Sequence, residues 1–174
     1  NWLAIHVITV AMSSAILSIS FATGMMYLLK VLDVTKKTIS SRSLEFVLYC
    51  LIVVVGFIGA STVFGFTTEP VTLDYIDVEG NESTVIYEMY PLVVNENNQQ
   101  VGILTITNKI DAAKLNSIAW AFIVGTLLYI VIRIITRESI SQLLKPLTKR
   151  VNANLMDEIS YRAVVIGFPL FALG

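Results

Sequence analysis

Long uncharged apolar runs alternate with polar stretches along the chain. The first run, residues 7–29, holds 23 residues without a charge. As a helix it would be about 34 Å long, against about 30 Å for the hydrocarbon core of a bilayer. Similar runs cover 44–66, with Glu45 near its start, and 117–135, interrupted only by Arg133, and a fourth starts near Ile159. The pattern predicts three membrane spans and a truncated fourth.

Small residues mark the faces on which the first two spans are expected to pack, because they let helices approach closely in lipid. In the second span Gly56 and Ala60 form such a pair, and Cys50 is expected to be a small buried hydrophobe. In the first span small residues recur at steps of three and four: Ala11, Ser14 or Ala15, Ser18 and Ala22. This first face predicts contact with another helix, within the chain or outside it.

Residues 67–116 have a different pattern, with eight acidic residues against two lysines. Residues 71–78 alternate at period two, as a half-buried strand does, and 79–82 read as a turn. Further strands are predicted over 84–90, where Pro91 ends the pattern, and over 101–107, after a second turn at 95–98. We expect a small β-rich domain that depends on the membrane part for stability.

The segment 136–160 combines basic residues with an apolar face. Pro146 interrupts the helical spacing, so two short helices meeting there are expected. A basic amphipathic segment of this kind tends to lie on the inner leaflet of a membrane. Its apolar positions are Ile140, Leu143, Leu144, Leu147, Val151 and Leu155.

Composition supports a membrane protein: 55% of residues are hydrophobic, 14% are charged, and the mean hydropathy is +0.74. The net charge of −1 gives no basis for nucleic-acid binding. A single cysteine excludes an intrachain disulfide, a Cys-x-x-Cys motif and a thiolate metal cluster. The chain begins without methionine and stops inside an apolar run, so we interpret it as a piece of a longer protein. The first run is too long for a signal peptide and lacks its charged leader.

Basic residues predict the sidedness of the spans. Residues 30–43 carry four Lys and Arg, residues 133–150 carry five, and residues 67–116 carry two. Loops rich in Lys and Arg stay in the cytoplasm. The first span would therefore run from outside to inside, and 67–116 would be extracytoplasmic. His6, at the outer end of the first span, would lie on the same side.

His6 is the only histidine and the leading candidate for chemistry. A neutral imidazole at pH 7 has a nitrogen lone pair that can ligate iron or zinc. The alternative is that His6 sits in the headgroup region beside Trp2, where amphipathic rings are common. Spacing alone favours this second interpretation, because no other ligand lies nearby in the sequence. A nucleophile–base triad has no support, and no catalytic residue is assigned.

A second motif begins with Asp-Glu-Ile-Ser-Tyr-Arg at 157–162 and continues through Gly-Phe-Pro at 167–169. Glu158 and Arg162 are spaced to pair on a helix, and acidic residues suit a helix N-terminus. Chemistry alone therefore predicts a helix cap and an anchor at the inner interface. Pro169 implies a kink inside the fourth span.

These two motifs resemble the cytochrome c assembly family, in particular the heme-handling membrane subunit of the system II synthase (ResC, CcsA or CcsB type). The opening Asn-Trp-Leu-Ala-Ile-His-Val is similar to the family's start, and the order of spans and loops also matches. The resemblance covers nearly the whole chain, and the two terminal motifs are its most specific parts. The second motif contains Asp157, Glu158, Tyr161, Arg162, Gly167 and Pro169. It implies a protein of the bacterial plasma membrane.

The resemblance implies that the subunit, with a ResB-type partner, carries heme b across the membrane and presents it to the Cys-x-x-Cys-His motif of an apocytochrome c. His6 falls at the place of the family's first external histidine, with Trp2 beside it, so the resemblance implies an axial ligand to heme iron. The chain departs from the family in having no tryptophan-rich segment and no second histidine. The fragment alone is expected to be inactive as a heme lyase.

The sequence thus predicts a mainly α, polytopic membrane protein with a small extracytoplasmic β-rich insertion. Its predicted divisions are 1–66 with the external histidine and two spans, 67–116 as the β domain, and 117–174 with the third span, basic segment and fourth helix. One alternative is a membrane receptor or scaffold whose β domain binds a ligand or protein. Another, a transporter half, lacks intramembrane charges to form a substrate path.

Overall fold

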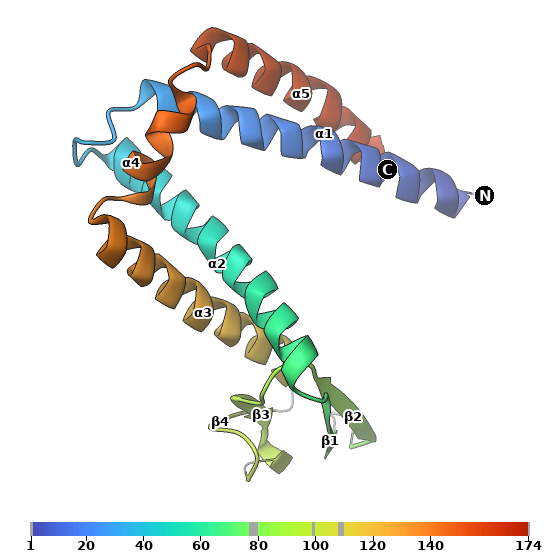
Figure 1. Ribbon diagram of the computed structural model, residues 1–174. Helices are drawn as coiled ribbons and strands as arrows, with labels where there is room; N and C mark the ends of the chain where they lie inside the picture. Colours follow the sequence, from blue (N-terminus) through green and yellow to red (C-terminus); the bar gives the residue numbers. More distant parts are fainter. Residues whose placement is uncertain (1, 77–79, 99, 108–109, 174) are drawn as a thin grey trace. The chain divides into compact units, whose positions relative to one another are not determined.

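The structure is a computed structural model that describes residues 2–76, 80–98, 100–107 and 110–173. It is mainly α-helical, as the apolar runs predict (Figure 1). The chain divides into two compact units, Asn1–Phe46 with Glu138–Gly174 (unit 1) and Val47–Arg137 (unit 2). The helices are α1 (Trp2–Val31), α2 (Ile39–Thr67), α3 (Ala112–Thr136), α4 (Ile140–Leu144) and α5 (Ala153–Leu173).

Three of these helices, α1, α2 and α3, are long and apolar enough to cross a bilayer, with 30, 29 and 25 residues. Over its described residues, α5 is not long and apolar enough by the same measure. It carries Asp157, Glu158 and Arg162 in its first half. The uncharged part that follows, residues 163–173, is only about 16 Å long as a helix, about half of a bilayer core.

The long helices begin about five residues before the apolar runs. α1 already includes His6, because no glycine or proline interrupts the chain between Trp2 and Val7. α2 begins after Thr38, whose Oγ1 accepts a hydrogen bond from the Ser41 N–H at 3.2 Å. α3 begins after Asp111, whose side chain caps the Lys114 N–H at 3.1 Å. Capping side chains, rather than hydrophobicity, therefore set the starts of α2 and α3.

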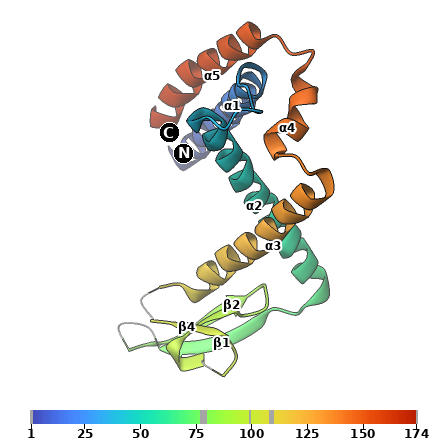
Figure 2. The same cartoon turned by 90° about the vertical axis from the view of Figure 1, so that its left-hand side faces the viewer.

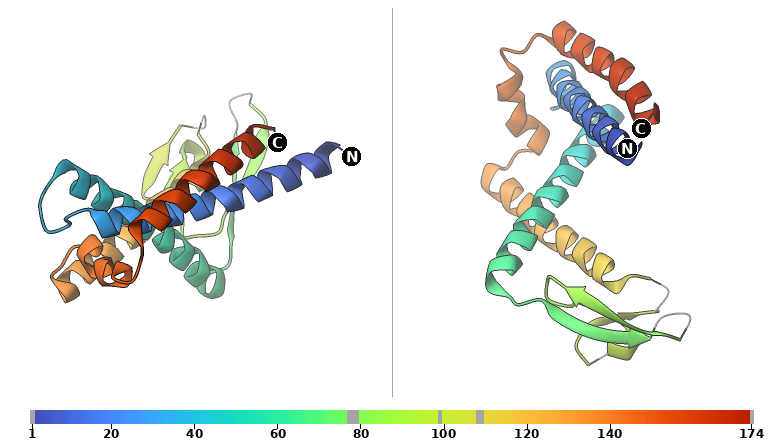
Figure 3. Two further views of the ribbon diagram at one scale, coloured as in Figure 1. Left: turned by 90° about the horizontal axis from the view of Figure 1, so that it is seen from above. Right: turned by 90° about the vertical axis from the view of Figure 1, so that its right-hand side faces the viewer.

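In unit 1, α5 runs antiparallel along α1, and α1 continues past the end of α5 (Figures 1 and 3). The Ser20 hydroxyl donates to the Ser160 carbonyl at 2.9 Å, and the Ser160 hydroxyl donates to the Ser20 carbonyl at 3.0 Å. The buried positions of α1 are Ser13, Ser20 and Leu29. The predicted small-residue face is instead exposed in the structure: Ala11, Ser14, Ala15, Ser18 and Ala22.

At the other end of unit 1, the basic segment forms α4 and a 3₁₀ turn, η2 (Lys145–Thr148). Pro146 lies at the start of η2, so the regular helix ends at Leu144, as predicted from the proline. The N–H groups of Ile140 and Ser141 donate to the Glu45 carboxylate at 3.0 and 3.1 Å. This carboxylate ties the first turn of α4 to the beginning of α2.

In unit 2, α2 and α3 approach each other at two glycines. A Cβ placed on Gly56 would lie 2.6 Å from the Gly125 Cα, and one placed on Gly125 would lie 2.5 Å from the Val53 Cα. The prediction that Gly56 marks a packing face is confirmed. The prediction that Cys50 is buried is wrong, because it is exposed on α2.

The polar segment forms two separate strand pairs at the end of unit 2 where α3 begins (Figure 2). β1 (Val71–Ile76) pairs antiparallel with β2 (Glu82–Tyr87), in a register that places Val71 opposite Tyr87. The predicted hairpin is therefore confirmed, although residues 77–79 of its predicted strand and turn lie outside the described residues. β3 (Val93–Asn95) was not predicted, and it pairs in parallel with β4 (Leu104–Ile106), which lies in the predicted third strand.

A small core holds these strands on α3. Tyr87, Val94 and Ala112 are its buried members, with 2%, 0% and 1% of their surface exposed. Inward-facing residues of β1 and β2 pack around them, including Leu73 and Val85. In the part of the chain that the structure describes, this buried cluster of the β segment includes Ala112 of α3, which accords with the segment's small size. The predicted divisions at 66 and 116 rest on composition and stay predictions.

Candidate functional site

His6 lies in the second turn of α1, with its side chain exposed. The His6 side chain makes no hydrogen bond or ion pair to any other residue that the structure describes. Trp2 is four positions earlier, so both rings lie on one face of the helix. Trp2 is 76% exposed. The arrangement leaves an imidazole nitrogen and a neighbouring indole ring accessible to a planar ligand.

The helix α5 stops short of these two residues. Gly167 faces Leu17 and Ile16 of α1, with a built Cβ 3.0 Å from the Leu17 Cγ. Because the pair is antiparallel, the remaining turn of α5 reaches past Leu17 toward the start of α1, and α1 continues beyond it (Figure 1). Trp2 to Val7 are all exposed. α1 and α5 therefore pack as one helix pair, and His6 lies on the end of α1 that α5 does not cover.

The described residues contain no group of three or more His, Cys, Asp or Glu that could hold a metal ion. His6 could therefore supply one ligand, not a complete metal centre. A heme fits this limit, because its porphyrin provides four nitrogens and leaves only axial positions to the protein.

The acidic motif lies inside α5 rather than at its start. The cap is Asn152, whose side-chain oxygen accepts from the N–H of Asn154 at 3.1 Å. The prediction that the acids cap the helix is therefore wrong, because α5 begins four residues earlier, at Ala153. Glu158 and Arg162 form the expected ion pair on the exposed surface. Asp157 and Tyr161 are also exposed, and Tyr161 is 70% exposed.

Gly167 and Pro169 have different surroundings in α5. Gly167 is buried against α1, where a side chain would displace Leu17. Pro169 lies inside the helix and is exposed. The glycine thus serves the α1–α5 contact. Its neighbours on α1 are Leu17 and Ile16, further along the helix than His6.

Asn116 of α3 was not predicted to have a role, and it fastens the β segment to the helix. It is 1% exposed. Its side-chain oxygen accepts from the N–H of Leu92 at 2.8 Å, and its amide donates to the Tyr90 carbonyl at 3.2 Å. The Trp120 indole, one turn further along α3, donates to the same carbonyl at 2.8 Å. In the sequence Asn116 is the last residue of the polar segment 67–116, where nothing singles it out.

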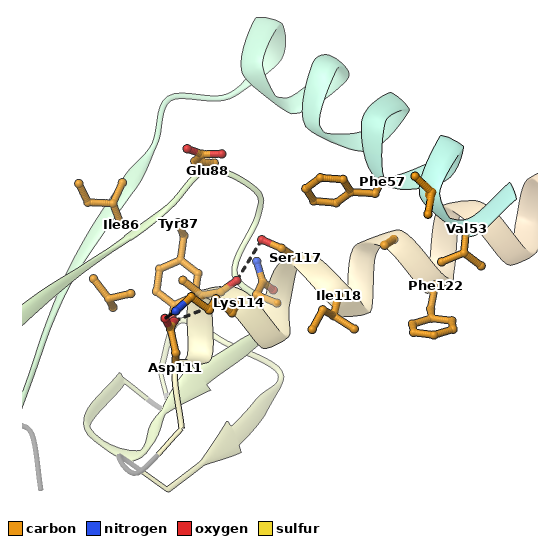
Figure 4. Close-up of a pocket in the computed structure, with 15 residues that line it drawn as sticks. Val53, Phe57, Ile86, Tyr87, Glu88, Asp111, Lys114, Ser117, Ile118 and Phe122 are labelled. Atoms are coloured by element: carbon orange, nitrogen blue, oxygen red, sulfur yellow. Dashed lines mark hydrogen bonds and ion pairs between the residues drawn. The ribbon is translucent and has the colours of Figure 1, made fainter. Parts of the chain in front are cut away.

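A cavity of about 820 Å³ lies within unit 2, between α2, α3 and the end of β2. Figure 4 shows Phe57 of α2 and Phe122 of α3 beside it, with Tyr87 and Glu88 from the end of β2. Most of its lining is apolar, and the volume is in the range of small-molecule sites. Asp111 and Lys114 contribute an ion pair of 3.0 Å to the lining.

Two groups beside this cavity have shifted pKa values. Burial, and then the charge of Asp111, raise the pKa of Tyr87 above its usual value. For Asp111, partial burial acts to raise the pKa, but hydrogen bonds from the Lys114 side chain and backbone outweigh it and lower the pKa. The Tyr87 hydroxyl is buried and has no hydrogen-bond partner in the described structure.

Comparison of the chain with models of known protein families, with curated proteins and with solved structures gives no match.

Proposed function

We propose that the chain belongs to a multi-pass membrane protein that presents heme at the outer face of a bacterial plasma membrane during cytochrome c assembly. The observation that carries this proposal is the α1–α5 pair. The two segments that resemble the heme-handling subunit stand 150 residues apart in the sequence, and the helices that carry them, α1 and α5, pack along each other through Ser20, Ser160 and Gly167. The pair places His6 of α1 and the second motif on α5 within one compact unit of the fold.

The proposed sidedness follows from the basic residues together with the helix lengths. Placing Lys30 and the α4–η2 segment in the cytoplasm puts the start of α1 and the β segment outside. α1 is about 45 Å long, about 15 Å more than a bilayer core. The excess lets the turn that carries His6 stand in the outer headgroup region or beyond it.

In this proposal His6 holds one axial position of the heme iron, and Trp2 packs against the porphyrin edge. Heme supplies the reactive vinyl groups, which form thioether bonds with the cysteine thiols of the apocytochrome. The imidazole fixes the iron and so sets the position of these vinyl groups relative to the incoming peptide. A second axial ligand and the ResB-type partner would come from outside these 174 residues, because His6 is the only histidine here.

The test is the heme content of the protein purified from its native membrane. Wild type is expected to show a Soret band, and His6→Ala to lose most of it. Ile5→Ala, an exposed neighbour on the same helix, is the matched control and should keep its heme. Imidazole added to His6→Ala should restore the band, because it can occupy the vacant coordination position. Equal heme in His6→Ala and wild type would contradict the proposal.

The cavity of unit 2 favours a second candidate function, a membrane receptor or scaffold whose extracytoplasmic part binds an apolar ligand. The largely apolar lining of the cavity suits such a ligand. This candidate predicts no Soret band, and instead a co-purifying apolar molecule that is lost in Phe57→Asp. Ile58→Asp, on the exposed surface of the same helix and outside the cavity lining, is its control.

A further inference from the structure

Three lysines converge on a second cavity, which lies entirely within unit 1. It has a volume of about 560 Å³ and is formed by the end of α1, the turn after it and the α4–η2 segment. Its basic residues are Lys30, Lys145 and Lys149, and Glu138 is its one acidic residue among those described. With three positive charges and one negative, the lining carries a net charge of +2.

Two of these lysines are held in place by backbone carbonyls. The Lys30 ammonium donates to the carbonyls of Thr148 and Lys149 at 3.1 and 2.9 Å. The Lys145 ammonium donates to the Leu32 carbonyl at 3.1 Å. An ammonium group has three donors, so Lys30 keeps one and Lys145 keeps two for another acceptor. Because both side chains are already fixed, an anion would bind without the usual cost of ordering them.

Lys149 has no such structural use. Its side chain is exposed and makes no hydrogen bond or ion pair within the part of the chain that the structure describes. Asp33 lies between the lining residues Lys30 and Val34 in the sequence. Its carboxylate does not neutralise the lysines of the cavity, because it is bonded to Thr35 and Lys36. The hydrogen bond from the Thr35 hydroxyl, and then that from Lys36, lower the pKa of Asp33 to about 2.

We infer that this lysine cavity binds the phosphate group of an anionic membrane phospholipid. Phosphate oxygens are acceptors that several ammonium groups can share. Basic pockets at the cytoplasmic ends of membrane helices bind such headgroups. Apolar side chains flank the cavity on the same elements: Val31 and Leu147 are 54% and 74% exposed. They offer a surface to acyl chains, which a free phosphate ion would not use.

This inference depends on the membrane placement of the chain but not on its proposed heme role. A negative heme experiment therefore leaves it standing, and a negative lipid experiment leaves the heme proposal standing. The two sites lie at opposite ends of α1, so substitutions at one do not touch the other.

The test is native mass spectrometry of the detergent-solubilised full chain, titrated with phosphatidylglycerol, with phosphatidylcholine as the zwitterionic reference. Lys149→Gln is expected to weaken phosphatidylglycerol binding about fivefold, from roughly 1 kcal/mol per lysine near a membrane surface. Lys149→Arg keeps the charge and should stay within about twofold of wild type. Lys37→Gln removes the same charge from an exposed lysine outside the cavity and should have little effect.

Three results would overturn the inference. Equal losses in Lys149→Gln and Lys37→Gln would mean that net charge, not the cavity, attracts the lipid. Equal binding of phosphatidylcholine and phosphatidylglycerol would remove the role of the lysines. Displacement of the lipid by millimolar inorganic phosphate would mean that the cavity takes a free anion. Thermal melts of each variant serve as the control for folding. They should match wild type, because the Lys149 side chain makes no bond to lose within the described structure.

Discussion

Asn116 is the residue whose loss we expect to affect the β segment most. Asn116→Ala removes the side-chain oxygen that accepts from the N–H groups of Leu92 and Val93. Each unpaired buried group costs about 1–3 kcal/mol, so we expect a loss of about 3 kcal/mol in unfolding free energy. Asn116→Asp keeps the acceptor for Leu92 but turns a buried carboxylate oxygen toward the Tyr90 carbonyl, so it should not restore the lost stability at neutral pH. Equal thermal stability of wild type and Asn116→Ala would contradict this account.

Tyr87 leads to the opposite expectation, because its buried hydroxyl has no partner among the described residues. Tyr87→Phe removes an unsatisfied group and keeps the ring, so stability should be unchanged or up to about 1 kcal/mol higher. The raised pKa means that wild type loses stability as pH rises above about 10, when the unfolded tyrosine ionises. The variant should lack this loss. Thermal melts at pH 8 and pH 10.5 measure both effects.

Asp111 links a helix cap to pH. Its lowered pKa means that its contribution to stability is full above about pH 4 and is lost as pH falls through the folded-state value. Asp111→Ala should cost about 1 kcal/mol at pH 7, the usual value of an N-cap. The difference in unfolding free energy between wild type and Asp111→Ala should narrow below pH 4. The stability of Asp111→Asn should depend little on the titration of this side chain in that range. A constant gap across this range would exclude the ionised cap.

Single residues differ in how far the sequence reveals them. His6 is found because it is the only histidine and stands beside an apolar run. The Glu158–Arg162 pair follows from helical spacing. Cys50 was predicted to be buried and is exposed. The prediction failed because an apolar run in a membrane helix does not tell which face meets lipid. Asn116 was missed because its partners are backbone groups more than twenty residues away.

Between helices, the closest approach is the α2–α3 contact at Gly56 and Gly125. Gly125→Val places a side chain against the Val53 Cα, which cannot move without shifting the helix. Overpacking of this kind costs about 1–3 kcal/mol or more, so the thermal midpoint should fall clearly. Gly59→Val is the control, because nothing lies within 4 Å of a Cβ built there. Equal melting of the two variants would contradict the observed packing.

The sequence predicted which elements exist better than where they begin. Apolar runs located α1, α2 and α3, since a span must be long and uncharged. The starts of α2 and α3 were missed by about five residues, because their caps, Thr38 and Asp111, lie before the apolar runs. β3 was missed because it has only three residues, too few to show alternation. Its parallel pairing with β4 depends on contacts that no local pattern records.

For the chain as a whole, the pairing of α1 with α5 was not predictable from periodicity. The small-residue face of α1 pointed to Ala11, Ser18 and Ala22, but the face that packs carries Ser20, which bonds to Ser160. Polar serine contacts between helices have no hydrophobic signature in a sequence. The units are likewise defined by packing, since α2 contributes to both.

The proposed function requires that His6 and the β segment lie outside the cell and that the lysine cavity lies inside. Cysteine accessibility in intact cells tests this directly, in a Cys50→Ala background that removes the chain's only cysteine. A membrane-impermeant maleimide should label His6→Cys and Glu88→Cys in intact cells, and Lys37→Cys only after the membrane is opened. Labelling of His6→Cys only after opening would contradict the account, because heme could not then be presented outside.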